Sequence, residues 1–404
     1  MGRAGAADVR PSRRDACRRP ARRGAAVSRL PDLQDALQDS LRADGLRLVT
    51  SVPRDRDHLL LELSDPAGET LAGQWHRDRA RVADLAAQTR VVAPDAVTVA
   101  ADGHVLVQAS GADRRLPALA RLASAPGARL VAHRAERRGV VRNADGSYTK
   151  VLRPGRLPAV VTAQPAYAGT RLRAPRVLAE DRAGGTLRMS ALSGRTLHQL
   201  LADPSVPDSD IGAVGRAVGS ALAALHAVPV TGLPTHDAAA EVAVTRRWLD
   251  HAAGYGLVDV TPLRRSLNRA MQRLAEGRPL APAYLHRDLH DKQVVIEPGL
   301  PPGLLDFDLA AAGEAALDLA NLLVHLELRS VQGRCSVESA SRCAVAVVEG
   351  YGPSGAVLSR LPAYLLTTRI RLAAVYAFRP GSTGQSMMIS TGMLPRVALE
   401  YGQT

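Results

Sequence analysis

The stretch Tyr284–Asn321 constrains the fold and chemistry of this chain more than any other part of its sequence. It opens with His286-Arg287-Asp288 and reaches Gln293 five residues after the aspartate. Two short apolar runs then flank a segment rich in proline and glycine, which predicts a β-hairpin. The second strand of this hairpin leads into Asp306-Phe307-Asp308, and a helical pattern containing Asp318 follows. The hairpin therefore places two acidic loops close together in space.

The order of these residues matches the needs of phosphoryl transfer. That reaction needs one carboxylate to orient the attacking hydroxyl and accept its proton, and oxygen ligands to hold Mg²⁺ against the phosphates. Asp288 suits the first role, and Asp306 suits the second, with the amide oxygen of Gln293 as a neutral co-ligand. A single His-x-Asp or Asp-x-Asp is typical of a capped turn or a solvated loop. Their joint occurrence, in this order, predicts a phosphotransferase site.

The same stretch resembles the catalytic and metal-binding loops of the aminoglycoside phosphotransferase family, the small-molecule branch of the protein-kinase-like fold. That family shows His-Gly-Asp, an Asn or Gln five residues on, a metal-binding Asp after a hairpin, and Gly-Asp-Pro before Asp-Leu-Ala. This chain has Arg287 in place of the usual Gly and Gly313-Glu314-Ala315 in place of Gly-Asp-Pro. A Gln at the position of Gln293 is also seen in maltokinase-like members.

The resemblance implies the cofactors and the supporting residues. ATP and Mg²⁺ would be the cofactors, and a hydroxyl of a small molecule would be the acceptor. His286 and Asp308 would support the site. Asp318 would brace the catalytic loop and would not touch the substrate.

The resemblance also implies an α+β, two-lobed protein-kinase-like fold, with a small β-rich N-lobe and a mainly helical C-lobe. We expect a disordered Arg-rich tail at 1–29, an α+β cap or N-lobe-like segment at 30–127, the kinase-like N-lobe at 128–200, and the helical C-lobe with both loops at 201–404. Short echoes about 82 residues apart, such as Arg47-Leu48-Val49 and Arg129-Leu130-Val131, suggest that the segment before residue 128 is a degenerate duplicate of the N-lobe. Chance similarity in an Ala/Arg/Leu-rich chain is the alternative.

Alternating apolar residues and turn signals predict the elements of these segments. Strands are expected at 46–52, 58–63, 70–75, 97–100, 104–109, 130–134, 139–142, 147–152, 186–191, 294–296 and 303–305. Helices are expected at 79–89, 116–123, 211–225, 369–378, and from Thr261, as its N-cap, to Gly277.

Lys150 is expected in the third strand of the N-lobe. Only Lys150 and Lys292 are lysines among the 52 basic residues, so a lysine in this strand indicates a need for a compact ammonium group. By resemblance it would contact the α- and β-phosphates of ATP, and the hinge from Met189 to Ala191 would receive adenine. Kinase-like folds pair this lysine with a Glu on the next helix. No acidic residue lies between Lys150 and Glu180, so Gln164 is the only polar candidate.

The formal net charge of +13 invites a nucleic-acid interpretation, but its distribution argues against one. Residues 1–29 hold nine arginines and two aspartates, and the few aromatic residues are not interleaved with basic ones. Nucleic-acid binding beyond weak contacts of the tail is therefore not expected. Three cysteines without a framework favour a reducing cytoplasm, and no apolar run is long enough to cross a membrane.

Three functions compete at this level. The first is an ATP-dependent kinase for a small-molecule hydroxyl, and the second is a catalytically weak, nucleotide-binding pseudokinase, motivated by the missing Glu and the missing Gly-rich loop. The third is a polyanion binder with an Arg-rich tail and a vestigial kinase body. From residue 321 onward the chain has eight arginines and four glutamates, so we expect a neutral or anionic acceptor, such as a sugar, and not a polycation. The sequence leaves the oligomeric state open.

Overall fold

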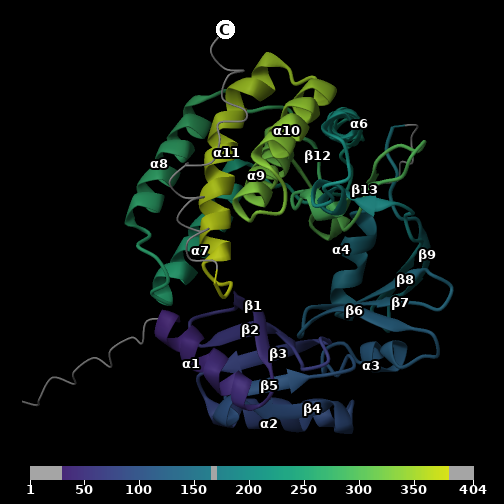
Figure 1. The fold of residues 1–404 in the computed structure, drawn as a ribbon, viewed down its shortest axis with the longest axis vertical. Coiled ribbons are helices and arrows are strands. Elements are labelled where there is room, and N and C mark those ends of the chain that lie inside the picture. Colours follow the sequence, from purple (N-terminus) through teal and green to yellow (C-terminus); the bar gives the residue numbers. More distant parts are fainter. Residues whose placement is uncertain (1–29, 165–170, 382–404) are drawn as a thin grey trace, which may run out of the picture.

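The computed structural model describes residues 30–164 and 171–381. The chain has the α+β, protein-kinase-like fold that the sequence predicts, with antiparallel sheets in its first half and mainly helices in its second. In Figure 1 the first sheet lies at the bottom, the second at the right and the helices at the top. The tail predicted at 1–29 lies outside the described residues.

The first sheet has five strands in the order β1-β2-β3-β5-β4, all antiparallel to their neighbours. Its strands are β1 (Arg47–Pro53), β2 (His58–Ser64), β3 (Thr70–His76), β4 (Val97–Ala100) and β5 (Val105–Gln108). Helix α1 (Leu30–Ala43) precedes the sheet, and α2 (Arg79–Arg90) connects its third and fourth strands. Asp78 caps α2 by accepting a hydrogen bond from the backbone N–H of Ala80, which satisfies one of the unpaired donors of the first turn.

The second sheet repeats this plan, with the strand order β6-β7-β8-β10-β9. Its strands are β6 (Arg129–Arg134), β7 (Arg138–Arg142), β8 (Tyr148–Leu152), β9 (Val177–Asp181) and β10 (Thr186–Met189). A short helix, α3 (Ala118–Ala123), precedes the sheet, and α4 (Leu157–Thr162) again follows the third strand. The two sheets therefore share one topology, as the echoes in the sequence suggested. The division at residues 127 and 200 into separate domains stays a prediction.

The second half of the chain is built of helices around two small sheets. Its helices are α5 (Leu197–Leu201), α6 (Asp208–His226), α7 (Ala238–Gly254), α8 (Thr261–Glu276), α9 (Ala316–Val331), α10 (Val337–Tyr351) and α11 (Gly355–Tyr376). In one small sheet β13 (Val294–Ile296) lies between β11 (Arg195–Thr196) and β14 (Gly303–Leu304), and in the other β12 (Ala283–Leu285) pairs with β15 (Ala311–Gly313). Helix α9 is buried along most of its length, because α10 and α11 both pack against it. It gives the catalytic segment a rigid support.

The first sheet also contacts the far end of the chain. The backbone N–H and the hydroxyl of Ser51 both donate to the carbonyl of Phe378, at 3.3 and 2.8 Å. The hydroxyl of Tyr255, at the end of α7, donates to the carbonyl of Asp55 at 2.7 Å. The three parts of the molecule are thereby joined into a ring-like arrangement, which Figure 1 shows.

Most predicted elements are confirmed to within a few residues, but three boundaries were wrong. Thr261 is the first residue of α8 and not its N-cap, because Asp259 accepts from the Thr261 N–H at 2.9 Å. The strand expected to reach Ala191 ends at Met189. The helix expected at 369–378 is the second half of α11, which continues through Pro362.

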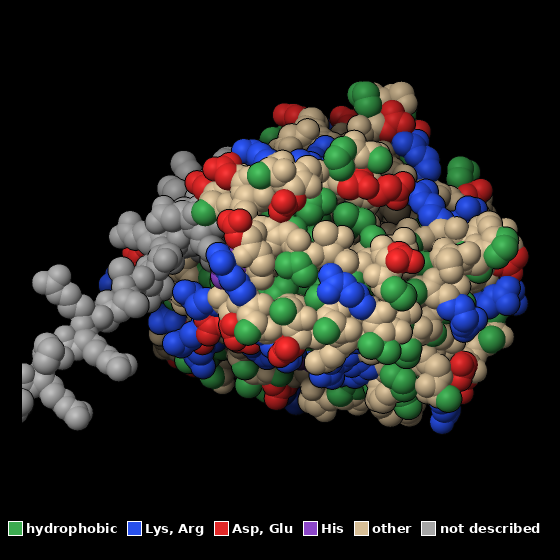
Figure 2. Space-filling model, turned by 90° about the horizontal axis from the view of Figure 1, so that it is seen from below, with side chains coloured by type: hydrophobic (Ala, Val, Ile, Leu, Met, Phe, Trp, Pro, Cys, Tyr) green, Lys and Arg blue, Asp and Glu red, His purple; other side chains and the backbone are tan. Residues whose placement is uncertain are grey.

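Two further expectations concern nucleic-acid binding and membrane-spanning segments. Seen from below, basic and acidic side chains are scattered over the same face and form no continuous basic surface there (Figure 2). No helix within the described residues combines the length and the apolar character that crossing a membrane requires.

Candidate active site

The catalytic loop between β12 and β13 is held by Asp318 of α9. The two carboxylate oxygens of Asp318 accept hydrogen bonds from the backbone N–H groups of His286 and Arg287, at 2.6 and 2.8 Å. The side-chain amide of Asn321 donates to the Arg287 carbonyl at 2.8 Å. Arg287 has a φ of +69°, which favours glycine and explains why the family pattern has Gly here. The fully buried Asp318 thus lies where a bracing residue is expected.

His286 connects the catalytic loop to the metal loop. Its side chain is buried, and its Nε2 lies 2.7 Å from the carbonyl of Leu305, to which it can only donate. Leu305 directly precedes Asp306, so this contact fixes the distance between the two acidic loops. His286 therefore lies where a supporting residue is expected.

A second support of the catalytic loop was not recognised in the sequence. Asp291 is fully buried and accepts two hydrogen bonds from the Arg329 guanidinium of α9, both at 2.8 Å, and contacts His198 Nδ1 of α5 at 2.7 Å. Burial alone would raise the pKa of Asp291, but Arg329 and His198 more than offset that effect and lower it. The spacing of Asp291 from Asp288 carries no signal of this role, because its partners lie far away in the chain.

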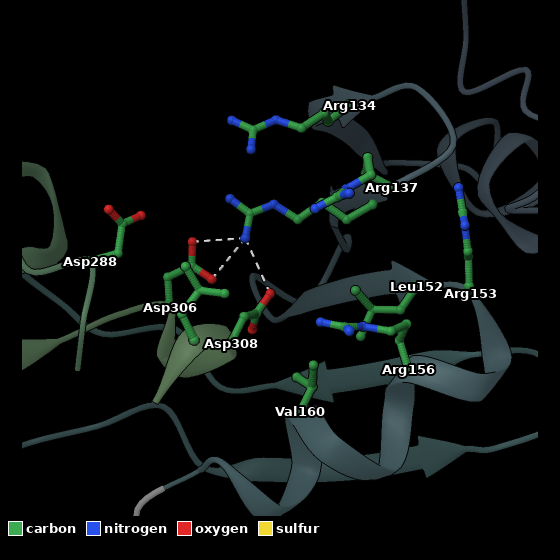
Figure 3. Close-up of a pocket in the computed structure, with 11 residues that line it drawn as sticks. Arg134, Arg137, Leu152, Arg153, Arg156, Val160, Asp288, Asp306 and Asp308 are labelled. Carbon is green, nitrogen blue, oxygen red and sulfur yellow. Dashed lines mark hydrogen bonds and ion pairs between the residues drawn. The ribbon is translucent and has the colours of Figure 1, made fainter. Parts of the chain in front are cut away.

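Asp288 faces a cavity of about 270 Å³ between the catalytic loop and the second sheet. Figure 3 shows Asp288 on one side of this cavity and Arg134, Arg137, Arg153 and Arg156 around the others. Within the described residues the Asp288 carboxylate has no hydrogen-bond partner, although it is partly buried. It is therefore available to an entering hydroxyl group.

Asp306 and Asp308 line the same cavity (Figure 3), and they share two cations, Lys150 and Arg138. Lys150 Nζ lies 2.9 Å from Asp306 Oδ1 and also bonds Asp308. Arg138 Nη1 donates to Asp306 and Asp308, at 2.9 and 3.1 Å. Burial would raise the pKa of Asp306, but Lys150 and Arg138 hold it well below its usual range. The Asp306 carboxylate is therefore ionised at neutral pH.

Lys150 has no partner on the following helix. The side-chain amide of Gln164, two residues beyond the end of α4, donates to the Val160 carbonyl at 3.1 Å, so the suggestion that it pairs with Lys150 was wrong. Lys150 is 4% exposed, and its ammonium group forms ion pairs with Asp306 and Asp308 instead. Arg138 was not recognised in the sequence as a partner of these aspartates. Its position at the start of β7 directs it into the cavity.

The donor set fits a Mg²⁺ ion held together with phosphates. Gln293 Nε2 lies 3.5 Å from Asp306 Oδ2. A rotation of this amide would bring its oxygen beside the Asp306 carboxylate, where both could bind one ion. Within the ranges 30–164 and 171–381, no cluster of three or more His, Cys, Asp or Glu side chains forms a metal site by itself. A site of this kind suits Mg²⁺, which usually takes one or two carboxylates and completes its shell with phosphate oxygens and water.

Met189 and Ala191, the expected hinge, lie at the end of β10. Met189 is buried in one apolar cluster with Leu152, Leu187 and Val160, of which Leu152 and Val160 line the cavity. Ala191 is exposed and lies outside the strand. Their contact with adenine stays a prediction.

Comparison with known proteins found several solved structures that resemble this chain. The chain resembles the solved structures of an aminoglycoside phosphotransferase from Streptomyces rimosus, with 19% identity over 61% of this chain and 94% of that one and a TM-score of 0.44. It also resembles a choline/ethanolamine kinase family protein from Mesorhizobium loti, with 18% identity over 69% and 91% and a TM-score of 0.44. A glucosamine kinase matches over 87% of this chain and 92% of its own, at 19% identity and a TM-score of 0.41. No curated protein matches.

The model of one protein family matches residues 128–358, which contain the second sheet, Lys150, both acidic loops and α9. That match covers more than half of the 404-residue chain. The chain therefore belongs to the phosphotransferase enzyme family.

Proposed function

We propose that this protein is an ATP-dependent kinase that phosphorylates a hydroxyl group of a neutral or anionic small molecule. The observation that supports the proposal is that Asp288, Asp306, Asp308 and Arg138 line one cavity, and that Lys150 pairs with two of these aspartates, Asp306 and Asp308. A free carboxylate lies on one side of this cavity, and a cluster of two carboxylates and two cations lies on another.

In this mechanism Asp288 orients the acceptor hydroxyl and accepts its proton. The hydroxyl oxygen forms a bond to the γ-phosphorus, the bond from that phosphorus to the β–γ bridging oxygen breaks, and ADP leaves with the electron pair. Lys150 and Arg138, released from the carboxylates by the arriving phosphates, bind the phosphate oxygens. Asp306 and Gln293 would hold Mg²⁺, which would neutralise developing negative charge. Arg134 and Arg137 add positive charge at the edge of the cavity, and Met189 and Ala191 would receive the adenine.

The acceptor is proposed to be neutral or anionic because acidic side chains of the helical region are already occupied. Glu314 is paired with Arg360, Glu327 with Arg369 and Glu241 with Arg371, at 2.6, 2.6 and 3.1 Å. The count of eight arginines against four glutamates was therefore a poor argument, since arginines in these pairs present no free charge. Arg396 and Glu400 lie outside the described residues. The pairing itself supports the proposal, because a polycation would find few free carboxylates there.

A screen for ADP release with a library of hydroxylated metabolites tests this function. We expect at least one sugar or sugar acid to be turned over with a higher catalytic efficiency than any kanamycin-type aminoglycoside. The products should carry a new phosphate ester, detected by mass spectrometry. An aminoglycoside that outperforms every neutral and anionic compound would contradict the acceptor class, and an absence of ATP turnover with every compound would contradict the kinase.

The second candidate is a nucleotide-binding protein with a regulatory role. The observation that favours it is the direct pairing of Lys150 with Asp306 and Asp308, with no carboxylate on α4 to compete for the lysine. Binding of ATP without slow, magnesium-dependent hydrolysis in the absence of an acceptor would favour this candidate over the first.

Replacement of Lys150 by Ala is expected to weaken ATP binding or to slow turnover by at least ~10-fold. The ammonium group is buried between two carboxylates, and its loss leaves them neutralised by Arg138 alone. Lys150→Arg is expected to recover only part of the activity, because a planar guanidinium does not replace a compact charge at this site. Calorimetric ATP titration and steady-state kinetics of both variants measure this. Full activity of the Arg variant would remove the argument from the scarcity of lysine.

Replacement of Asp306 by Ala is expected to abolish the effect of magnesium on nucleotide binding. The carboxylate is the main charged ligand proposed for the ion. Its removal also frees Lys150 and Arg138, so the affinity for metal-free ATP should be retained or increased. Calorimetric titrations with and without magnesium distinguish the two effects. An unchanged magnesium dependence in the variant would exclude Asp306 as the ligand.

A further inference from the structure

A second cavity, of about 260 Å³, lies over the first sheet, next to the catalytic one. It is bounded by the ends of β2 and β3, by α2 and by the β6–β7 turn. Arg137 and Arg153 line both cavities, so the two are neighbours. Neither the phosphotransfer mechanism nor the family match, which begins at residue 128, gives the side chains of the first sheet a role.

The catalytic cavity lies against the second sheet. The register of the strands shows that the second cavity lies at the equivalent position of the first sheet. Gln74 of β3 lies opposite Leu60 of β2 and Leu106 of β5. Lys150 of β8 lies opposite Val140 of β7 and Leu187 of β10 in the same way. Gln74 is therefore the counterpart of Lys150.

The same register extends to the mouth of the cavity. His58 begins β2 and lies opposite His76, as Arg138 begins β7 and lies opposite Leu152. His58 is thus the counterpart of Arg138. The strand positions that carry Lys150 and Arg138 in the second sheet are therefore repeated, with other side chains, in the first.

The second cavity is strongly basic. Six arginines line it, Arg54, Arg81, Arg114, Arg115, Arg137 and Arg153, against two carboxylates, Asp55 and Glu136.

Glu136 is already paired, since it lies 2.7, 3.5 and 3.8 Å from Arg114, Arg115 and Arg153. By contrast, Arg54 and Arg81 form no side-chain hydrogen bond or ion pair with any described residue. Burial and the neighbouring arginines, Arg54 among them, lower the pKa of Arg137 to about 10. Arg54, Arg81 and Arg137 thus line one cavity without a side-chain partner among the described residues, and they outnumber its remaining carboxylate, Asp55, which favours an anion there.

A buried polar atom without a partner also faces this cavity. Gln74 is 1% exposed, and its Nε2 donates to Gln108 Oε1 at 2.9 Å. Gln108 in turn donates to the Ala112 carbonyl at 2.7 Å, which fixes the orientation of both amides. The Gln74 oxygen accepts no hydrogen bond of normal geometry from the described residues, and the His58 ring at the cavity mouth is the neighbouring donor. The Nε2 atoms of the stacked His58 and His76 rings, whose centroids are 4.0 Å apart, are likewise unpaired there.

We propose that this cavity binds the phosphate ester of a small molecule that also carries a hydroxyl or amino group. The phosphate would contact Arg54, Arg81 and Arg137, and the hydroxyl or amino group would donate to Gln74 Oε1. The cavity has no counterpart of Asp288, Asp306 or Asp308 among its lining residues, so it binds its ligand without phosphoryl transfer. Binding here does not depend on the proposed kinase activity.

Calorimetric titration of the full chain with glucose 6-phosphate and with inorganic tripolyphosphate, without magnesium, tests the site. Two variants separate it from the catalytic cavity, because Arg54 and Arg81 line the second cavity alone. We expect Arg54→Gln/Arg81→Gln to lose one of two binding sites for tripolyphosphate and to bind glucose 6-phosphate at least 10-fold more weakly. The control Arg56→Gln/Arg90→Gln removes the same charge from exposed positions outside the cavity and should bind as the wild type does. Equal losses in both double variants, or a loss in neither, would overturn the proposal.

Replacement of Gln74 by Leu tests whether the hydroxyl or amino group of the ligand donates a hydrogen bond to Gln74 Oε1. It should weaken glucose 6-phosphate binding while leaving the tripolyphosphate affinity unchanged within about 2-fold, because tripolyphosphate carries no hydroxyl or amino group that could donate to Gln74. An equal effect on both ligands, or no effect on either, would remove Gln74 from the site.

Arginine modification of the wild-type protein gives a test that needs no variant. With phenylglyoxal and peptide mass spectrometry, tripolyphosphate should slow the modification of Arg54 and Arg81 at least several-fold, and that of Arg56 and Arg90 not at all. Modification of Arg54 and Arg81 at the unprotected rate would overturn the proposal even if a variant failed to fold.

Discussion

Replacement of Asp288 by Asn is expected to lower the rate of phosphoryl transfer by at least ~100-fold while leaving ATP binding intact. Asn has the size and shape of Asp but cannot accept the proton of the attacking hydroxyl. Asp288 forms no hydrogen bond or ion pair with the described residues, so its replacement disturbs no contact of the folded protein. The loss should therefore fall on the rate constant kcat and not on the free energy of unfolding.

Steady-state kinetics with the acceptor found in the screen, together with ATP calorimetry, measure this effect. Asp84→Asn is a matched control, because Asp84 lies exposed on α2, away from the cavity. Near-wild-type turnover by Asp288→Asn would exclude Asp288 as the general base. A matching loss of ATP affinity would show that the side chain acts on the nucleotide and not on the acceptor.

The sequence predicted the catalytic segment well because its residues are close together in the chain. Asp288, Gln293 and Asp306 lie within one loop-hairpin-loop unit, and local turn chemistry brings such residues together without help from the rest of the fold. The paired strands β13 and β14 confirm that hairpin. The bracing position of Asp318 was implied by the family resemblance alone, and its two oxygens accept from the backbone N–H groups of His286 and Arg287.

The partners of these residues could not be predicted, because they depend on contacts between distant parts of the chain. Lys150 and Arg138 meet Asp306 only when the second sheet packs over the metal loop, at separations of 156 and 168 residues. Asp291 and Arg329 are brought together in the same way. A count of charges along the sequence cannot show which of them neutralise one another.

The residues that depart from the family pattern are explained by their contacts. Arg287 adopts the left-handed conformation usually left to glycine, at a cost that Asp318 and Asn321 offset through three hydrogen bonds to its segment. Glu314, where the family has Asp, has a longer side chain that reaches Arg360 of α11. These departures are thus built into the packing, which argues against a decayed site.

Replacement of Arg360 by Met is expected to lower the free energy of unfolding by about 3–5 kcal/mol. Its guanidinium donates to both carboxylate oxygens of Glu314, at 2.6 and 2.7 Å, and to the carbonyl of Leu274 at the end of α8, at 2.7 Å. Both side chains of the ion pair are buried, with exposed fractions of 3% and 7%. Met fills much of the same volume, so the loss comes from leaving a buried carboxylate without its partner. Unfolding by urea, followed by circular dichroism, measures the change.

Two further variants separate this cause from a loss of packing. Arg264 and Asp250 form an ion pair at 2.6 Å whose side chains are about half exposed, at 49% and 57%, so Arg264→Met should cost less than about 1 kcal/mol. In Arg360→Met/Glu314→Leu both charges are gone, and we expect at least half of the lost stability to return, because no carboxylate stays buried without a partner. Equal losses in Arg360→Met and Arg264→Met would show that burial of the pair does not set its contribution. A double variant as unstable as Arg360→Met would show that the hydrogen bond to the Leu274 carbonyl, which closes the end of α8, is the larger part of what Arg360 does.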